Sequence, residues 1–305
     1  MNQEKRLHRV GWIGVGAMGR PMCLNLLKAG YAVTAFDRNP EQLERVRGEG
    51  IGVAASPREL ARDCDVVFST IFDDQGLRDI VLAPNGLAAG AGGASVYVDM
   101  STVSPAGSAE IAEVLGPRGI AYLRAPVSGT VSLAESAQLT TFVSGPREAF
   151  DLVRPLLECL TSRQSHLGTG EEARVVKLMI NLLVTMSTAA IGEALAFGQK
   201  AGLDRELMVD AINESITGSA HYRVKADKLK RRDYSPVGSI ALVIKDVSMA
   251  LKVADATGST LPISQEVYQT LLEMDRRGFG RYDVVALADS ADLLAAGVSS
   301  GSGSR

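Results

Sequence analysis

Short apolar runs alternate with longer helical patterns along the first half of the chain. Strands that alternate with helices are typical of a parallel, doubly wound sheet. The predicted strands are residues 10–13, 32–36, 52–54, 65–71, 95–99, 120–125, 139–144 and 165–167, and a helix is expected at 146–160. These elements predict an α/β domain over residues 1–170, with a sheet that extends beyond the usual doubly wound arrangement.

The strand signals stop after Gly170, and a long helical pattern follows. Residues 171–201 contain no proline and are apolar on nearly every side in the middle, which predicts a long buried helix. A membrane span is the alternative, because residues 178–197 are about long enough to cross a bilayer. Polar side chains interrupt this stretch, so burial between domains or subunits is favoured. They are Asn181, Thr185, Ser187, Thr188 and Glu193.

The rest of the chain carries only helical and turn signals. Residues 202–296 predict an all-helical domain for substrate binding and oligomerisation. The Gly/Ser tail at 297–305 cannot bury enough surface to order itself, and we exclude it from the fold.

A glycine-rich turn follows the first predicted strand. Glycines in the spacing Gly-x-Gly-x-x-Gly let the backbone turn sharply and approach a pyrophosphate, whose charge the next helix stabilises through its N-terminus. Asp37 ends the second strand about 20 residues downstream, where a carboxylate accepts hydrogen bonds from a ribose diol. The order predicts a Rossmann dinucleotide site, joined by the long interdomain helix to an all-α C-terminal domain. Its predicted loop contacts are Gly14, Val15, Gly16, Ala17, Met18 and Gly19.

Composition narrows the function classes further. A net charge of -3 and 22% charged residues describe an ordinary globular protein with no basic face for nucleic acid or an anionic membrane. The scattered cysteines Cys23, Cys64 and Cys159 argue against a disulfide framework, and no secretory segment is evident, so we expect a cytoplasmic protein. The three histidines are too dispersed to bind a metal, and no metal site is assigned.

Lys177 is the best candidate for acid/base chemistry. It stands in the first turns of the long helix, and Asn181 follows at i+4 on the same face, so both can reach one bound molecule. A lysine in a dry cleft, near a second cation such as Lys245, is brought toward the pKa range useful for proton transfer. The alternative is a lysine that merely extends from a helix end into solvent.

In four motifs the chain resembles the β-hydroxyacid dehydrogenase family, which includes 3-hydroxyisobutyrate dehydrogenase and tartronate semialdehyde reductase. The resemblance covers about Val10 to Ala288 and is specific because the motifs occur in the family's order. The motifs are Gly11 to Gly19 for cofactor, Ala125 to Gly129 for substrate, Lys177-x-x-x-Asn181 for catalysis, and Lys245-Asp246 late in the chain.

The resemblance implies a role for each matching residue. Lys177 is the expected general acid/base, and Asn181 holds the reacting group or the lysine. Ser128, with the backbone N–H groups of Gly129 and Thr130, is expected to bind the substrate carboxylate. Without the family, this segment would be interpreted as a tight turn.

The remaining cofactor contacts also come from the resemblance. They are Ile71, Thr102 and Lys245, although Thr102 could instead cap a helix. The chain departs from the family pattern at Arg124, Thr130, Phe72 and Gly238, which we expect to alter the walls of the substrate pocket.

The expected reaction is NAD(P)-dependent hydride transfer to or from a short anionic 3-hydroxy acid or its semialdehyde. Asp37 opposes a 2'-phosphate whereas Arg38 favours one, and we predict NAD over NADP. Two alternatives stay open: an imine-reducing relative, against which Lys177 counts, and a non-catalytic dinucleotide-binding or chromatin-associated protein. The long helix is apolar on more of its surface than a single helical domain of this size could cover, which predicts a homodimer or homotetramer.

Overall fold

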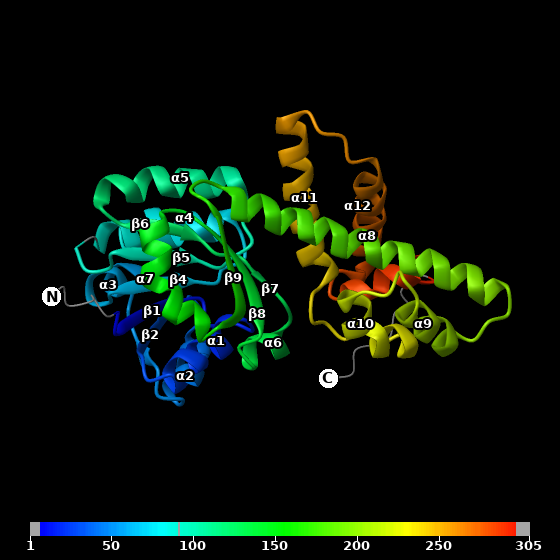
Figure 1. Cartoon of the computed structure of the whole chain (residues 1–305), viewed down its shortest axis with the longest axis horizontal. Helices are drawn as coiled ribbons and strands as arrows, with labels where there is room; N and C mark the ends of the chain where they lie inside the picture. The colour runs from blue at the N-terminus through cyan, green and yellow to red at the C-terminus, as the bar shows by residue number, and fades with distance from the viewer. Residues whose placement is uncertain (1–6, 91, 297–305) are drawn as a thin grey trace. The chain divides into compact units, whose positions relative to one another are not determined.

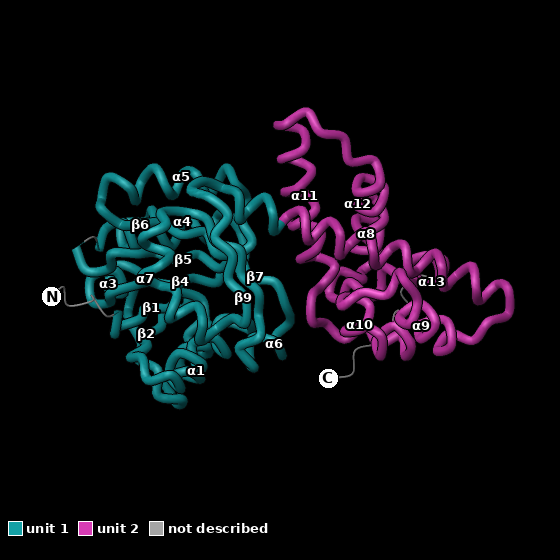
Figure 2. The backbone as a smooth tube through the Cα atoms, in the orientation of Figure 1, with its two compact units in different colours: residues 1–177 teal, residues 178–305 magenta. Residues whose placement is uncertain are grey.

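The computed structural model describes residues 7–90 and 92–296. Contacts between Cα atoms divide the chain into two compact units, Met1–Lys177 and Leu178–Arg305 (Figure 2). The Gly/Ser tail that we excluded from the fold lies outside the described residues.

Unit 1 is built on a nine-stranded sheet within its described residues (Figure 1). The order is β3-β2-β1-β4-β5-β6-β8-β7, and β9 pairs with β8. The strands are β1 (Arg9–Ile13), β2 (Ala32–Phe36), β3 (Gly52–Val53), β4 (Val66–Ser69), β5 (Val96–Asp99), β6 (Ala121–Arg124), β7 (Val127–Ser128), β8 (Leu139–Ser144) and β9 (Thr161–Gly168). The pairs from β3 to β6 are parallel, as predicted, but β8 runs antiparallel to both β6 and β7.

Helices cover both faces of this sheet, and the strand sequences show why. Trp12 and Phe68 stack with ring centroids 5.2 Å apart in one core cluster, whereas Val67 and Tyr97 belong to another. A sheet buried on both sides needs such continuous apolar strands. The helical elements are α1 (Gly19–Lys28), α2 (Pro40–Arg47), α3 (Pro57–Asp63), α4 (Asp74–Leu82), η1 (Leu87–Gly90), α5 (Pro105–Leu115), η2 (Gly116–Arg118), α6 (Val131–Glu135) and α7 (Arg147–Glu158).

Among its described residues, unit 2 consists of helices joined by turns, with an isolated β-bridge between Ser239 and Asp283. Helix α8 (Glu172–Lys200) begins in unit 1 and continues into unit 2, as the predicted interdomain helix does. The other elements are α9 (Arg205–Glu214), α10 (Ala220–Arg231), α11 (Ile240–Thr257), α12 (Pro262–Met274), η3 (Asp275–Phe279), η4 (Val284–Asp289) and α13 (Ser290–Ala296). The predicted fold class, a Rossmann domain followed by an all-α domain, is therefore confirmed.

Helix α8 is long and apolar enough to cross a membrane by length and composition alone. Only 28% of its most apolar window is buried within the single chain. Its contacts include a core formed by Leu178, Met249 and Ala250, as expected of a helix that organises a folded domain. The preference for a buried helix over a membrane span stays a prediction.

Asp283 is the most heavily bonded carboxylate of unit 2. It is completely buried and accepts hydrogen bonds from the Lys225 ammonium at 2.8 Å and from the backbone N–H groups of Val237, Gly238 and Val285. Burial alone would raise the pKa of Asp283, but the bonds from Lys225 and the backbone outweigh it and lower the pKa. This carboxylate therefore stabilises the folded unit only while it is charged.

We expect Asp283→Asn to destabilise the protein by about 3 kcal/mol at pH 7, because Lys225 is left without its buried partner. Since the folded pKa lies below the ordinary value of 3.8, the stabilisation is complete above that pH and is lost as the pH falls through the folded pKa. Urea unfolding of both proteins at pH 7 and about pH 3, followed by circular dichroism, measures this difference. Asp255→Asn, at an exposed position of α11, is the control. An equal penalty at both pH values would contradict the assignment.

Candidate functional site

The glycine-rich loop between β1 and α1 contains two glycines that the fold requires and one that it does not. Gly14 has a φ of 89°, and a Cβ there would lie 2.1 Å from the carbonyl oxygen of Thr70. A Cβ at Gly19 would lie 1.9 Å from the carbonyl oxygen of Gly14. At exposed Gly16, by contrast, a Cβ would meet no described atom within 4 Å. The missing side chain at Gly16 leaves open space where a ligand can approach the backbone.

The N-terminus of α1 is prepared for an anion. The helix has no side-chain cap and no acidic residue in its first turn. The next four helices, α2 to α5, are each capped by a side chain of the loop before them. The first N–H groups of α1 therefore have no side-chain acceptor, so they are available to bind the pyrophosphate of a dinucleotide.

Asp37 fixes the second strand to the glycine-rich loop. Its Oδ2 accepts from the N–H of Val15 at 2.8 Å, and its Oδ1 accepts from the N–H of Asn39 at 2.8 Å. Each carboxylate oxygen has a second lone pair that can accept from a ribose hydroxyl. Arg38 follows and is exposed. Both the acid that favours NAD and the cation that favours a 2'-phosphate are thus present at the end of β2.

Ile71 and Thr102, the other predicted cofactor contacts of unit 1, follow the ends of β4 and β5. The N–H of Ile71 donates to the Oγ of Ser101 at 2.9 Å, which connects the two loops. Ser104, and not Thr102, caps α5. The alternative interpretation of Thr102 as a helix cap is therefore wrong. Thr102 is half-buried, and its contact with the cofactor stays a prediction.

A buried ion pair that the sequence analysis missed lies at this edge of the sheet. The Arg174 guanidinium, in the first turn of α8, contacts Asp99 Oδ2 at the end of β5 at 2.6 Å, and neither side chain has exposed surface. The Tyr122 hydroxyl accepts from Arg174 at 2.9 Å, and burial raises the pKa of Tyr122 to about 12. Charged residues in otherwise apolar strand and helix positions are the signal that could have revealed this pair.

A second ion pair, with the charges reversed, joins the neighbouring strand β6 to the residue just before α8. Arg124, at the end of β6, donates from Nε to Glu171 Oε1 at 2.8 Å. Its guanidinium also lies over the Tyr122 ring, 4.5 Å from the centroid. The family departure at Arg124 is thus a buried contact to the residue before α8.

The predicted substrate segment is more than a tight turn. Val127 and Ser128 form strand β7, which pairs with Thr141 and Thr140 of β8. Gly129 follows with a φ of 144°, a conformation that a side chain disfavours. Within the described residues, the half-buried Ser128 hydroxyl makes no hydrogen bond. A fixed backbone thus carries a hydroxyl that can bind a ligand.

Thr130 directly precedes the short helix α6 and does not cap it through its side chain. Its hydroxyl instead lies 2.8 Å from the Ser132 hydroxyl. The backbone N–H of Thr130 is one of the two that we assigned to the carboxylate, and that assignment stays a prediction.

The predicted lysines fall in different units. Lys177 is the last residue of unit 1, and its side chain is half-buried. In unit 2, Asp246 brings together the other two candidates: its Oδ2 accepts from Asn181 Nδ2 at 2.7 Å, and its Oδ1 lies 2.9 Å from Lys245 Nζ. Asp246, quoted in the sequence only as the neighbour of Lys245, therefore contacts both: it holds the Asn181 amide by a hydrogen bond and pairs with Lys245 by charge.

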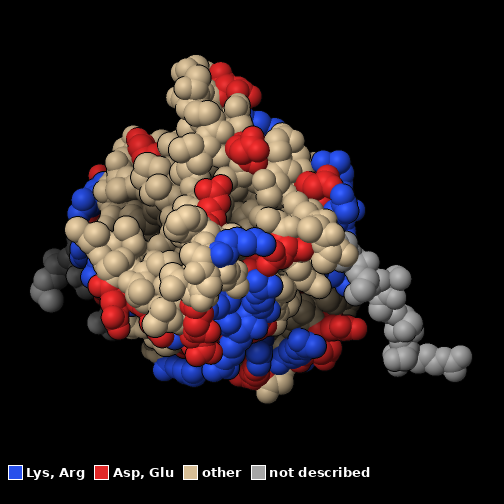
Figure 3. Space-filling model, turned by 90° about the vertical axis from the view of Figure 1, so that its right-hand side faces the viewer, with Lys and Arg blue, Asp and Glu red and all other residues tan. Residues whose placement is uncertain are grey.

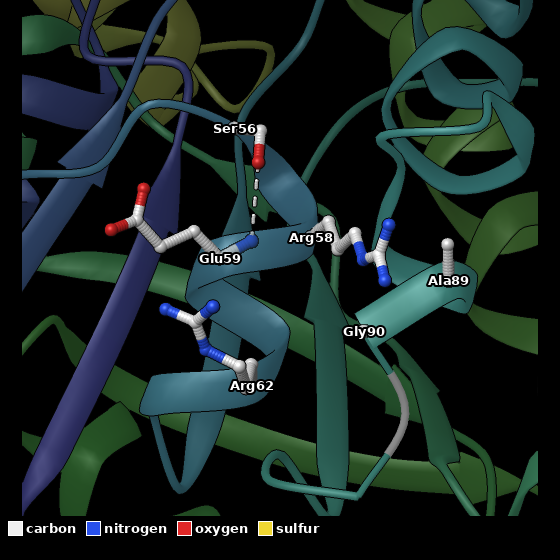
Figure 4. A pocket seen from close by; sticks show the side chains of 6 residues that line it. All are labelled: Ser56, Arg58, Glu59, Arg62, Ala89 and Gly90. Atoms are coloured by element: carbon white, nitrogen blue, oxygen red, sulfur yellow. Dashed lines mark hydrogen bonds between the residues drawn. The ribbon is translucent and has the colours of Figure 1, made fainter.

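A surface depression beside α3 contains none of the predicted site residues (Figure 4). It is lined by Ser56, Arg58, Glu59, Arg62, Ala89 and Gly90. Ser56 accepts from the N–H of Glu59, and Arg62 pairs with Asp63 at 2.7 Å. These contacts belong to the local structure of α3. Among the described residues, no group of His, Cys, Asp and Glu is arranged to bind a metal.

Basic side chains gather on one face of the molecule beside acidic ones (Figure 3). In unit 2, three lysines of α10 pair with aspartates. They are Lys225 with Asp283, Lys228 with Asp233, and Lys230 with Asp210. Local basic charge is therefore balanced by carboxylates, and the absence of a nucleic-acid partner stays a prediction.

The Rossmann sheet, the open glycine loop and the uncapped α1 define a dinucleotide-binding protein. Two family models extend this assignment. The NAD binding domain of 6-phosphogluconate dehydrogenase matches residues 9–168, and the NAD-binding domain of NADP-dependent 3-hydroxyisobutyrate dehydrogenase matches residues 171–290. The chain belongs to the β-hydroxyacid dehydrogenase family and is an NAD(P)-dependent dehydrogenase, as the resemblance implied.

Individual relatives support the family along nearly the whole chain. L-threonate dehydrogenase of Cupriavidus necator is 32% identical over 90% of this chain and 93% of its own length. The structure of Mycobacterium tuberculosis 3-hydroxyisobutyrate dehydrogenase with L-serine has a TM-score of 0.85 at 26% identity, covering 94% of this chain and all of that one. The structure of Psf3 with NADP+ and 2-OPP has a TM-score of 0.83 at 26% identity, covering 92% and 99%.

Proposed function

We propose that this dehydrogenase interconverts a short 3-hydroxy acid and its semialdehyde, with Lys177 as general acid/base. The observation that supports this most strongly is that Arg174, about one helical turn before Lys177 on α8, is bound to the carboxyl end of β5, and that Glu171, just before α8, is bound to the end of β6. In a doubly wound sheet this edge is where cofactor and substrate bind. Two of the relatives named above, L-threonate dehydrogenase and 3-hydroxyisobutyrate dehydrogenase, are named for hydroxy acids, which supports the same class for this chain.

Each residue then has a defined task. The nicotinamide supplies or accepts the hydride when bound. In reduction, Lys177 gives a proton to the carbonyl oxygen, and in oxidation it takes the proton from the hydroxyl. The Ser128 hydroxyl and the N–H groups of Gly129 and Thr130 bind the carboxylate of the substrate. Asn181, one turn after Lys177 on α8 and oriented by Asp246, holds the reacting oxygen.

The test of substrate and cofactor is a panel of C3 and C4 hydroxy acids and semialdehydes, including sulfonated and phosphonated analogues. We expect turnover only with compounds that carry an anionic group and an oxygen at the 3-position. We also expect a higher kcat/KM with NADH than with NADPH, because Asp37 repels a 2'-phosphate. A clear preference for NADPH would contradict the Asp37 argument, and turnover of cyclic imines alone would favour the imine-reducing alternative.

The exposed apolar surface of α8 supports a homodimer or homotetramer. Met179, Leu183 and Phe197 are 52%, 56% and 79% exposed within the single chain. We propose that a second copy covers them. Light scattering at micromolar concentration is expected to show a dimer or larger species, and Leu183→Glu is expected to shift it toward monomer. Gln75→Glu, which adds the same charge on α4, is the control. A stable wild-type monomer would contradict the proposal.

A further inference from the structure

Arg174 and its partner Asp99 are both fully buried at this edge of unit 1. The Arg174 guanidinium donates to Asp99 Oδ2 at 2.6 Å, the Ser101 carbonyl at 2.7 Å, the Tyr122 hydroxyl at 2.9 Å and the Ser108 hydroxyl at 3.3 Å. Burial opposes the charged form, but Tyr122 and Asp99 outweigh it and raise the pKa of Arg174 above its ordinary value. Arg174 is therefore charged and held in one orientation by acceptors from several directions.

The same network reaches the residues predicted to contact the cofactor. The Ser101 hydroxyl donates to Asp99 Oδ1 at 2.5 Å and accepts from the N–H of Ile71 at 2.9 Å. Thr102 directly follows Ser101. One buried chain of hydrogen bonds thus connects the loops after β4 and β5 to the first turn of α8.

Two ion pairs fix the start of α8 against the sheet in one register: in one the strand carries the acid, and in the other it carries the cation. Asp99 and Arg124 are register partners on β5 and β6, and they meet Arg174 and Glu171, respectively. The strand ends carry one acid and one cation, and the opposite charges stand three residues apart, one just before α8 and one in its first turn. Sliding or rotating α8 would therefore separate Arg174 from Asp99 and pull Glu171 away from Arg124.

Stability alone is a weak reason for such an arrangement. Replacing a buried ion pair with well-packed apolar residues is often neutral or stabilising, whereas directional bonds select one arrangement. A catalytic group displaced by about 1 Å loses about 100-fold in rate. Lys177 lies three residues after Arg174, on the next turn of the same helix. We infer that Arg174 is a positioning residue that holds Lys177 in register with Ile71 and Thr102. This inference rests on the proposed function of Lys177.

The test is Arg174→Lys, which keeps the charge but loses the planar fork. We expect kcat for the best semialdehyde of the panel to fall about tenfold or more. The pH at which kcat is half-maximal is expected to shift. The Kd of the reduced cofactor is expected to stay within about threefold of the wild-type value. The matched control is Arg205→Lys, because Arg205 forms a similarly buried ion pair with Asp289 in unit 2, with two bonds of 2.8 Å. It is expected to lower Tm and leave kcat and its pH profile unchanged.

The double variant Asp99→Asn, Arg174→Met removes both charges together, so that no buried charge is left unpaired. It is expected to fold, to bind cofactor, and to lose kcat as Arg174→Lys does. Wild-type kcat and pH profile in both variants, or failure of both to fold, would overturn the positioning role and assign Arg174 to stability. If Lys177→Ala still abolishes turnover in that case, the proposed function stands. If Lys177→Ala keeps the rate, both conclusions fail.

Discussion

Lys177→Ala is expected to lower kcat by about 10³-fold or more, in both directions of the reaction, while the Kd of the cofactor changes little. Removing a positioned acid/base typically costs 10² to 10⁴ in rate, and Lys177 is placed here for proton transfer and not for binding the dinucleotide. Steady-state kinetics measures the rate, and quenching of the fluorescence of Trp12 by added cofactor measures binding, since Trp12 Nε1 donates to the Gly14 carbonyl of the glycine loop at 3.2 Å.

Chemical rescue separates lost chemistry from lost structure. A small primary amine added to Lys177→Ala can supply the missing proton donor in the space that the side chain leaves, so we expect a concentration-dependent partial recovery of kcat. Lys252→Ala, at an exposed position of α11, is the control and should behave as wild type. Near-normal turnover of Lys177→Ala without added amine would exclude the acid/base assignment.

Gly16→Ala is expected to weaken cofactor binding about tenfold or more without loss of stability. A Cβ at Gly16 meets no described atom within 4 Å, so the fold tolerates it, but it fills the space through which a pyrophosphate approaches the backbone. A glycine replaced by alanine at a permitted φ often gains stability, by about 0.4–1 kcal/mol. Titration with NADH and NADPH, together with the Tm, measures both effects.

Gly19→Ala provides the contrast within the same loop. Its Cβ would lie 1.9 Å from the Gly14 carbonyl oxygen and 2.5 Å from the Thr70 hydroxyl, so the loop itself must shift. We expect a loss of about 1–3 kcal/mol or more in stability, together with loss of cofactor binding. Normal binding by Gly16→Ala would show that the cofactor does not pass over this glycine.

Much of the fold could be predicted because its signals are local. The strand patterns and the glycine loop are short-range features, and they gave the Rossmann domain and the helical second domain. From local pattern alone, without the family resemblance, the two-residue strand β7 is indistinguishable from a tight turn, because so short a segment after Pro126 shows no periodicity. The antiparallel orientation of β8 relative to β6 and β7 depends on the path of the chain after β7. The alternation of strands and helices along the sequence does not specify that orientation.

Only those residues of the candidate site that belong to a sequence motif could be predicted. Gly16, Asp37 and Ser128 stand in recognisable spacings, and the structure places each on a fixed backbone. Arg174 and Asp99 are 75 residues apart, and neither belongs to a motif. Their pairing follows from the tertiary structure, which brings the start of α8 to the end of β5.

The most direct measurement of the central claim is a single turnover. Enzyme saturated with reduced cofactor is mixed with the preferred semialdehyde, and loss of cofactor absorbance at 340 nm, about the maximum of the nicotinamide, follows hydride transfer. The account predicts rapid oxidation by the wild type and oxidation about 10³-fold slower or more by Lys177→Ala, with the cofactor bound equally in both. Equal rates in the two proteins would contradict it.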